Sequence, residues 1–69
     1  MTDFFVIAVG KQWFARLISR QGGIQTSPRV TGAAVLDAAE AQRLVPLIRR
    51  SRHRVRVEVL SERDPRTRR

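Results

Sequence analysis

The sequence contains no cysteine, no tyrosine and a single histidine, His53. Without cysteine the chain can form neither a disulfide nor a thiolate metal site. The carboxylates are scattered along the chain, so no converging metal ligands and no nucleophile with its base are visible. We therefore expect a protein that is not an enzyme, holds no cofactor and acts on no small-molecule substrate.

Long apolar runs are also missing. The longest run, Phe4 to Val9, is far shorter than the about 20 residues that cross a bilayer. Asp3 stands where a signal peptide would carry basic residues. We expect a cytoplasmic protein with no membrane partner, and a chain of 69 residues predicts one small domain whose core is marginal.

Positive charge is abundant and is concentrated in the second half of the chain. The net charge at pH 7 is +8. Residues 1–42 carry four basic and three acidic residues, whereas residues 43–69 carry ten arginines and three acids. This asymmetry indicates an anionic partner such as nucleic acid, an acidic protein face or a membrane surface. The alternative is that the arginines only keep a small domain soluble.

The first 18 residues predict a β-hairpin. Phe4 to Val9 is rich in β-branched and aromatic residues, and Gly10-Lys11 is typical of a type II′ turn. Gln12 to Ile18 would form the return strand, with Ala8 opposite Trp13. Because strand side chains alternate, one face of the hairpin would pack on a helix. The side chains of that face are Phe4, Val6, Ala8, Trp13, Ala15 and Leu17.

The other face of the hairpin is mixed but still rather apolar, and we expect it to point outward. Exposed patches of this kind are usually a dimer interface or a binding site, so a homodimer is one expectation. Two alternatives stay open: the two faces are exchanged, or the segment from Ile24 to Leu36 folds over the patch. The candidate interface residues are Phe5, Ile7, Phe14, Arg16 and Ile18.

The middle of the chain predicts a short third strand and one helix. Ile24 to Thr26 favours a strand that ends at Ser27-Pro28. Asp37 to Glu40 resembles a capping box, and it precedes apolar residues at helical spacing. Pro46 predicts either a kink or a helix that ends near Val45 and is followed by a second turn. The apolar stripe of this helix is Ala41, Leu44, Val45 and Ile48.

The last part of the chain predicts a strand and a tail. Arg54 to Leu60 alternates valine with charged residues, as a half-buried strand does. Residues 61–69 are charged, include Pro65 and contain no apolar residue, which predicts a disordered basic tail after a domain spanning residues 1–60. The predicted fold class is α+β: a small antiparallel or mixed sheet, made of the hairpin and the C-terminal strand, packed on one helix in the order ββ(β)αβ.

The arginines between the helix and the last strand form the candidate binding surface. Their side chains would contact phosphates, with an affinity that falls steeply with salt. No helix-turn-helix, zinc finger or RNA-binding motif accompanies them. The candidate residues for nucleic acid or another anionic partner are Arg43, Arg49, Arg50, Arg52, Arg54 and Arg56.

The layout of the whole chain resembles that of small phage and prophage accessory proteins. The resemblance rests on the Phe4–Ile18 hairpin, the string Ala34-Val35-Leu36-Asp37-Ala38-Ala39-Glu40-Ala41 and the closing Val55-Arg56-Val57-Glu58-Val59. The sequence departs from the pattern at Pro46 and in its many arginines. The resemblance implies a protein that binds and redirects a host machine, such as RNA polymerase, a motor, a transcription regulator or a CRISPR complex.

Two functions follow from these patterns. The first is a non-enzymatic basic module that acts on nucleic acid, or on a nucleic-acid machine, through the arginine-rich surface. The second is a phage-type inhibitor that binds a host protein through the face of the β-hairpin.

Overall fold

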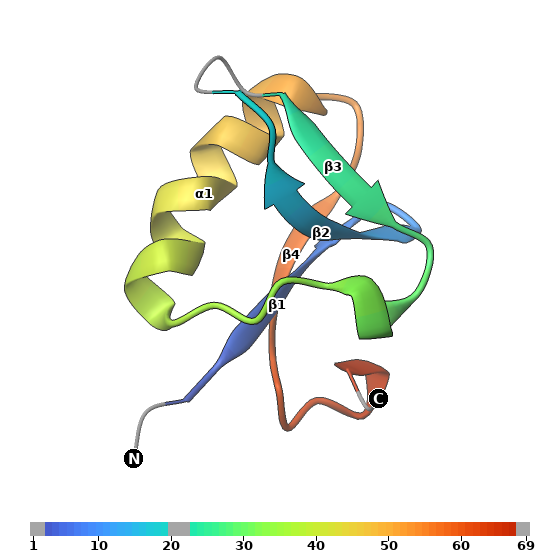
Figure 1. Ribbon diagram of the computed structural model, residues 1–69, viewed down its shortest axis with the longest axis vertical. Helices are drawn as coiled ribbons and strands as arrows, with labels where there is room; N and C mark the ends of the chain where they lie inside the picture. Colours follow the sequence, from blue (N-terminus) through green and yellow to red (C-terminus); the bar gives the residue numbers. More distant parts are fainter. Residues whose placement is uncertain (1–2, 20–22, 68–69) are drawn as a thin grey trace.

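A computed structural model describes residues 3–19 and 23–67 of the chain. Its four strands form one antiparallel sheet in the order β3-β2-β1-β4, and one helix packs on the sheet (Figure 1). This arrangement confirms the predicted α+β class and the predicted order of elements. The elements are β1 (Phe5–Val9), β2 (Gln12–Leu17), β3 (Ile24–Ser27), the 3₁₀ helix η1 (Val30–Gly32), α1 (Ala38–Ser51), β4 (Val57–Ser61) and the 3₁₀ helix η2 (Pro65–Thr67).

The turn between β1 and β2 has the predicted register. Ala8 pairs with Trp13 and Val9 with Gln12. Gly10 has a φ of 62°, and no non-glycine residue in the described part of the chain has a positive φ. A positive φ at the first central residue alone is what a type II′ turn requires. A side chain at this position would be strained and would also meet Val55, whose Cγ1 lies 2.5 Å from the place of a Cβ.

The two faces of the hairpin are exchanged relative to the prediction. Ile7 and Phe14 lie in the core under α1, with exposed fractions of 0% and 2%, and Phe5 packs against the same cluster. The predicted outward position of these three side chains is therefore wrong. Of the five candidate interface residues, Arg16 and Ile18 are exposed. The buried residues of this core are Ile7, Val9, Phe14, Ile24, Leu36, Ala41 and Ile48.

The opposite face of the sheet is covered by the segment that follows β3. Val6 and Leu60 are buried there against Ala33, with Trp13 and Val30 packed around them. The sheet is thus apolar on both sides, which explains why alternation along the hairpin could not identify the side that carries the helix. The third strand forms where it was predicted and ends before Pro28.

Helix α1 begins at the predicted cap and passes through its proline. The Asp37 side chain accepts a hydrogen bond from the backbone N–H of Glu40 at 2.8 Å. The helix continues beyond Pro46 to Ser51, so the alternative of a helix ending near Val45 is wrong. Both Pro46 and Gln42 are exposed, and water can therefore replace the hydrogen bond that the proline removes at the Gln42 carbonyl.

The last strand is shorter than predicted at its start. β4 begins at Val57, not at Arg54, because residues 52–55 form the turn that reverses the chain after α1. The N–H of Val55 donates to the Arg52 carbonyl within this turn. The N–H of Gly10 then donates to the Arg56 carbonyl at 2.7 Å, which attaches the turn to the hairpin.

Residues 61–67 are ordered, so the predicted disordered tail is wrong for this segment. Ser61 ends β4, and the following residues fold back into η2. Thr67 is 5% exposed, and its hydroxyl lies 2.8 to 3.0 Å from three backbone carbonyl oxygens. The domain therefore extends to at least Thr67, while Arg68 and Arg69 lie outside the described residues.

The exchange of faces can be tested with two substitutions on the hairpin face that was predicted to point outward, one at a buried residue and one at an exposed residue. Phe14→Ala should lower the free energy of unfolding by about 3–5 kcal/mol, because it leaves a cavity under α1. Ile18→Ala should change it by less than about 0.5 kcal/mol, because Ile18 is 61% exposed. Urea denaturation followed by circular dichroism measures both, and equal effects would contradict the assignment.

The ordered C-terminal segment can be tested at Thr67. Thr67→Val keeps the shape of the side chain but removes the hydroxyl that lies within hydrogen-bond distance of three carbonyl oxygens, so it should cost about 1–2 kcal/mol of stability. Thr67→Ser retains the hydroxyl and should cost less. A disordered segment would make both variants indistinguishable from the unmodified protein in the same denaturation experiment.

Candidate functional site

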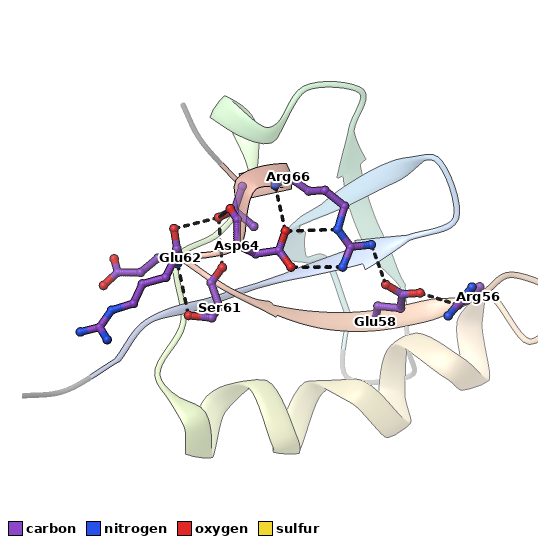
Figure 2. Close-up of polar contacts among 8 residues, drawn as sticks. Arg56, Glu58, Ser61, Glu62, Asp64 and Arg66 are labelled. Carbon is purple, nitrogen blue, oxygen red and sulfur yellow. Dashed lines mark hydrogen bonds and ion pairs between the residues drawn. The ribbon is translucent and has the colours of Figure 1, made fainter.

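Acidic side chains neutralise the arginines nearest the C-terminal end of the fold. Glu58 contacts Arg56 on one side and Arg66 on the other, and Arg66 also pairs with Asp64 at 3.2 Å. Figure 2 shows this chain of contacts on the side of β4 away from α1. Arg56, one of the six candidate residues, is therefore part of a neutral network and is less available to a partner than predicted.

The pair of Asp64 and Arg66 is held by several hydrogen bonds. Asp64 accepts from the backbone N–H of Arg66 at 2.8 Å and from its guanidinium at 3.2 Å. The side-chain hydrogen bond from Arg66 is the main cause that lowers the pKa of Asp64 below its ordinary value. The same bond raises the pKa of Arg66. Arg66 thus has a counterion two residues away and contributes little free positive charge.

The arginines at the end of α1 are in a different situation. Arg49 and Arg50 lie in the last turn, Arg52 is the C-cap, and Arg54 lies in the turn before β4. All four side chains belong to exposed residues, and no ion pair joins any of them to an acid within residues 3–19 and 23–67. We call these four residues the arginine cluster.

Part of this pattern stabilises the helix. The C-terminal end of an α-helix carries a partial negative charge, which favours Arg49 and Arg50 in the last turn. The dipole effect falls off within that turn, so it does not account for Arg54, three residues after the helix ends. Stabilisation of the helix therefore explains Arg49 and Arg50 but does not explain the positive charge of Arg54.

The remaining candidate, Arg43, lies apart from the cluster. It is seven residues before Arg50, which places it about 10 Å along the helix axis and on nearly the same side. Its neighbours around a shallow hollow are Leu17, Leu44 and Leu47. The structure therefore brings four of the six predicted arginines together, offsets Arg43 and neutralises Arg56.

Sequence reasoning missed Lys11 as a member of this surface. Lys11 lies in the hairpin turn, is exposed, and lines with Arg52 a hollow of about 430 Å³. The hydrogen bond between Gly10 and Arg56 holds the hairpin turn beside the turn that follows α1. The predicted hairpin placed Lys11 at a tip, but only the fold shows which other segment lies next to that tip.

Comparison of the chain with protein-family models, with curated proteins and with solved structures finds no match. In the described part of the chain, no three histidine, aspartate or glutamate side chains are grouped so that they could hold a metal ion. The same residues include no helix of the length and apolar character that crossing a bilayer requires. The arginine cluster is therefore the candidate site on which a functional argument can be built.

The Asp64–Arg66 pair predicts a specific dependence of stability on pH. Because the pKa of Asp64 is lower in the folded chain, its ionised form stabilises the fold above about pH 4, and this contribution disappears as the pH falls through the folded-state pKa. Asp64→Asn should therefore be less stable than the unmodified protein near neutral pH and equally stable in strong acid. Thermal unfolding across that pH range measures the difference.

The pairing itself is tested with a double variant that combines Asp64→Asn with Arg66→Gln. The double variant should lose little more stability than either single variant, and additive losses would contradict the pairing.

Proposed function

We propose that the protein is a non-enzymatic binding module whose arginine cluster contacts the phosphates of nucleic acid, either free or within a nucleic-acid machine. The observation that carries this proposal is the separation of charge in the fold. Arg56 and Arg66 pair with Glu58 and Asp64, and Arg63 pairs with Asp3, whereas the arginine cluster has no acidic partner in the described residues.

The chemistry of the cluster suits phosphate. A guanidinium offers several donors in a planar fork that matches two phosphate oxygens, and it stays charged at every physiological pH. The four side chains are already in water, so binding does not first break ion pairs within the protein. Contacts of this kind give affinity and orientation but little sequence preference.

The surface of the alternative function is only partly exposed. Of the five hairpin residues that a phage-type inhibitor would use, Ile7 and Phe14 are buried in the core under α1, Phe5 is half-buried, and Arg16 and Ile18 are exposed. The arginine cluster, whose four members are all exposed, therefore supports the first function better. The resemblance to phage accessory proteins stays a prediction about origin, and it agrees with a partner that is a nucleic-acid machine.

The proposal can be tested by fluorescence anisotropy with a labelled DNA duplex and a labelled single-stranded RNA at several salt concentrations. We expect affinity in the micromolar range or tighter at low salt, with a logarithmic salt slope of about −0.9 for each phosphate contacted on duplex DNA. Replacing Arg49, Arg50 and Arg54 by Gln should weaken binding at least tenfold and reduce the slope by about 2 to 3.

A matched control separates the cluster from net charge. Replacing Arg16, Arg29 and Arg63 by Gln removes the same three charges from exposed positions elsewhere on the fold. The control should lose less than about threefold in affinity. Equal losses for the two triple variants would overturn the assignment of the cluster, and no binding to either probe at low salt would overturn the function.

A further inference from the structure

Strand β4 lies at the edge of the sheet, beside α1, and presents unpaired backbone groups. Antiparallel strands exchange hydrogen bonds at every second residue. The N–H of Gly10 donates to the Arg56 carbonyl, and the N–H of Glu62 donates to the Phe4 carbonyl. The even-numbered residues of β4 therefore direct their backbone N–H and C=O groups toward β1. Val57 and Val59 therefore direct their N–H and C=O groups outward, away from the sheet.

An apolar groove of about 370 Å³ runs beside this edge. It lies between α1 and the sheet, and Val45 and Pro46 of the helix face Phe5 and Val59 across it. Val59 is 42% exposed although it lies on the same face as the buried core. The helix thus leaves the outermost strand incompletely covered on its apolar side.

The other edge of the sheet is less suited to a further strand. β3 has four residues, its pairing with β2 is irregular between Phe14 and Arg16, and Pro28 follows directly after its end. Proline and irregular pairing are features that protect sheet edges from added strands. β4 contains neither, so its edge is the open one.

We propose that a second copy of this chain occupies the β4 edge, so that two β4 strands pair antiparallel and join the two sheets. An added strand would lie about 4.8 Å from β4. Its valine side chains would be on the α1 side of the sheet and would cover the groove. The same contact, repeated by the two-fold axis, would cover the groove of the second copy.

The charges of the strand select one register for this pairing. With Val59 opposite Val59 of the second copy, Arg56 lies opposite Glu62, and the pair occurs twice. A shift of one register step in one direction places Glu58 opposite Glu58, and a shift in the other places Glu58 opposite Glu62. Both shifts bring like charges together, which destabilises a sheet.

The chosen register gives an ion-pair partner to Glu62, and Arg56 would then lie between its own Glu58 and Glu62 of the second copy. Glu62 has no ion pair in the described residues, although its neighbour Arg63 contacts Asp3. The Ser61 carbonyl already accepts from Asp64 and Thr67, but the Ser61 N–H remains directed outward. Four hydrogen bonds can form: Val59 N–H to Val59 C=O and Ser61 N–H to Val57 C=O, each twice.

The dimer does not depend on the proposed function. Where both hold, the arginine clusters of the two copies lie at opposite ends of the joined β4 strands, because each cluster precedes the start of its own strand. A polyanion that reaches both would contact twice as many arginines as it would on one copy.

The dimer is tested without nucleic acid, so its outcome is independent of the binding experiment. Sedimentation equilibrium of the full chain should show a concentration-dependent dimer. Val59→Lys should weaken association at least tenfold, because a lysine on the edge opposes strand addition. Val35→Lys is the matched control, since Val35 is 50% exposed and lies outside the sheet edge, and it should change association less than twofold.

The register is tested by exchanging charges. Arg56→Glu alone and Glu62→Arg alone each place like charges opposite each other and should weaken self-association roughly tenfold. A mixture of the two variants restores both opposite-charge pairs in a heterodimer and should associate more tightly than either variant by itself. Failure of the mixture to do so overturns the register. A monomeric mass up to roughly 1 mM, or a dimer insensitive to Val59→Lys, overturns the proposal.

Discussion

Burial of β1 on both of its faces is the constraint on which the rest of the structure depends. Val6 is 3% exposed and Ile7 is 0% exposed, although adjacent side chains of a strand point in opposite directions. A chain this small has one helix for two apolar faces, so the segment after β3 must cover the second face. After covering this face, the segment pairs with β1 through a bridge between Leu36 and Phe5. Helix α1 begins two residues after Leu36.

The position of the arginine cluster follows from this path. Because α1 starts after Leu36 and runs for 14 residues, its C-terminal end reaches the level of the β1–β2 turn, where the chain must reverse into β4 (Figure 1). The arginines of the reversal, Arg52 and Arg54, are exposed to solvent, whereas Val55 of the same turn lies against Gly10 of the hairpin turn. Glu58 and Asp64 come later in the chain, in β4 and the segment after it, and pair there with Arg56 and Arg66 (Figure 2). The excess of arginine in the second half of the sequence is thus divided in the fold between an ion-paired network around Glu58 and the exposed arginine cluster.

Much of the local structure could be predicted because short-range rules determine it. The Gly10 turn sets the hairpin register, since only a residue that tolerates a positive φ fits its first central position. Asp37 marks the helix start through a hydrogen bond to a residue three positions away. The clustering of arginines at residues 49–54 is also local, so most of the candidate site was visible in the sequence. The fold class then follows from the order of these elements.

The sequence by itself therefore determined the elements, the hairpin register and the location of the charge. Tertiary structure alone decided which face of the hairpin meets α1, because both faces are apolar and alternation is symmetric between them. It decided that Lys11 joins the basic end, because Lys11 and Arg52 come from segments distant along the chain. Arg56, by contrast, pairs with Glu58 only two residues further along the chain. Tertiary structure also decided that residues 61–67 are ordered, through Thr67 and the Arg66–Glu58 pair. Local propensity cannot report such contacts, since their energy arises only after the chain has folded.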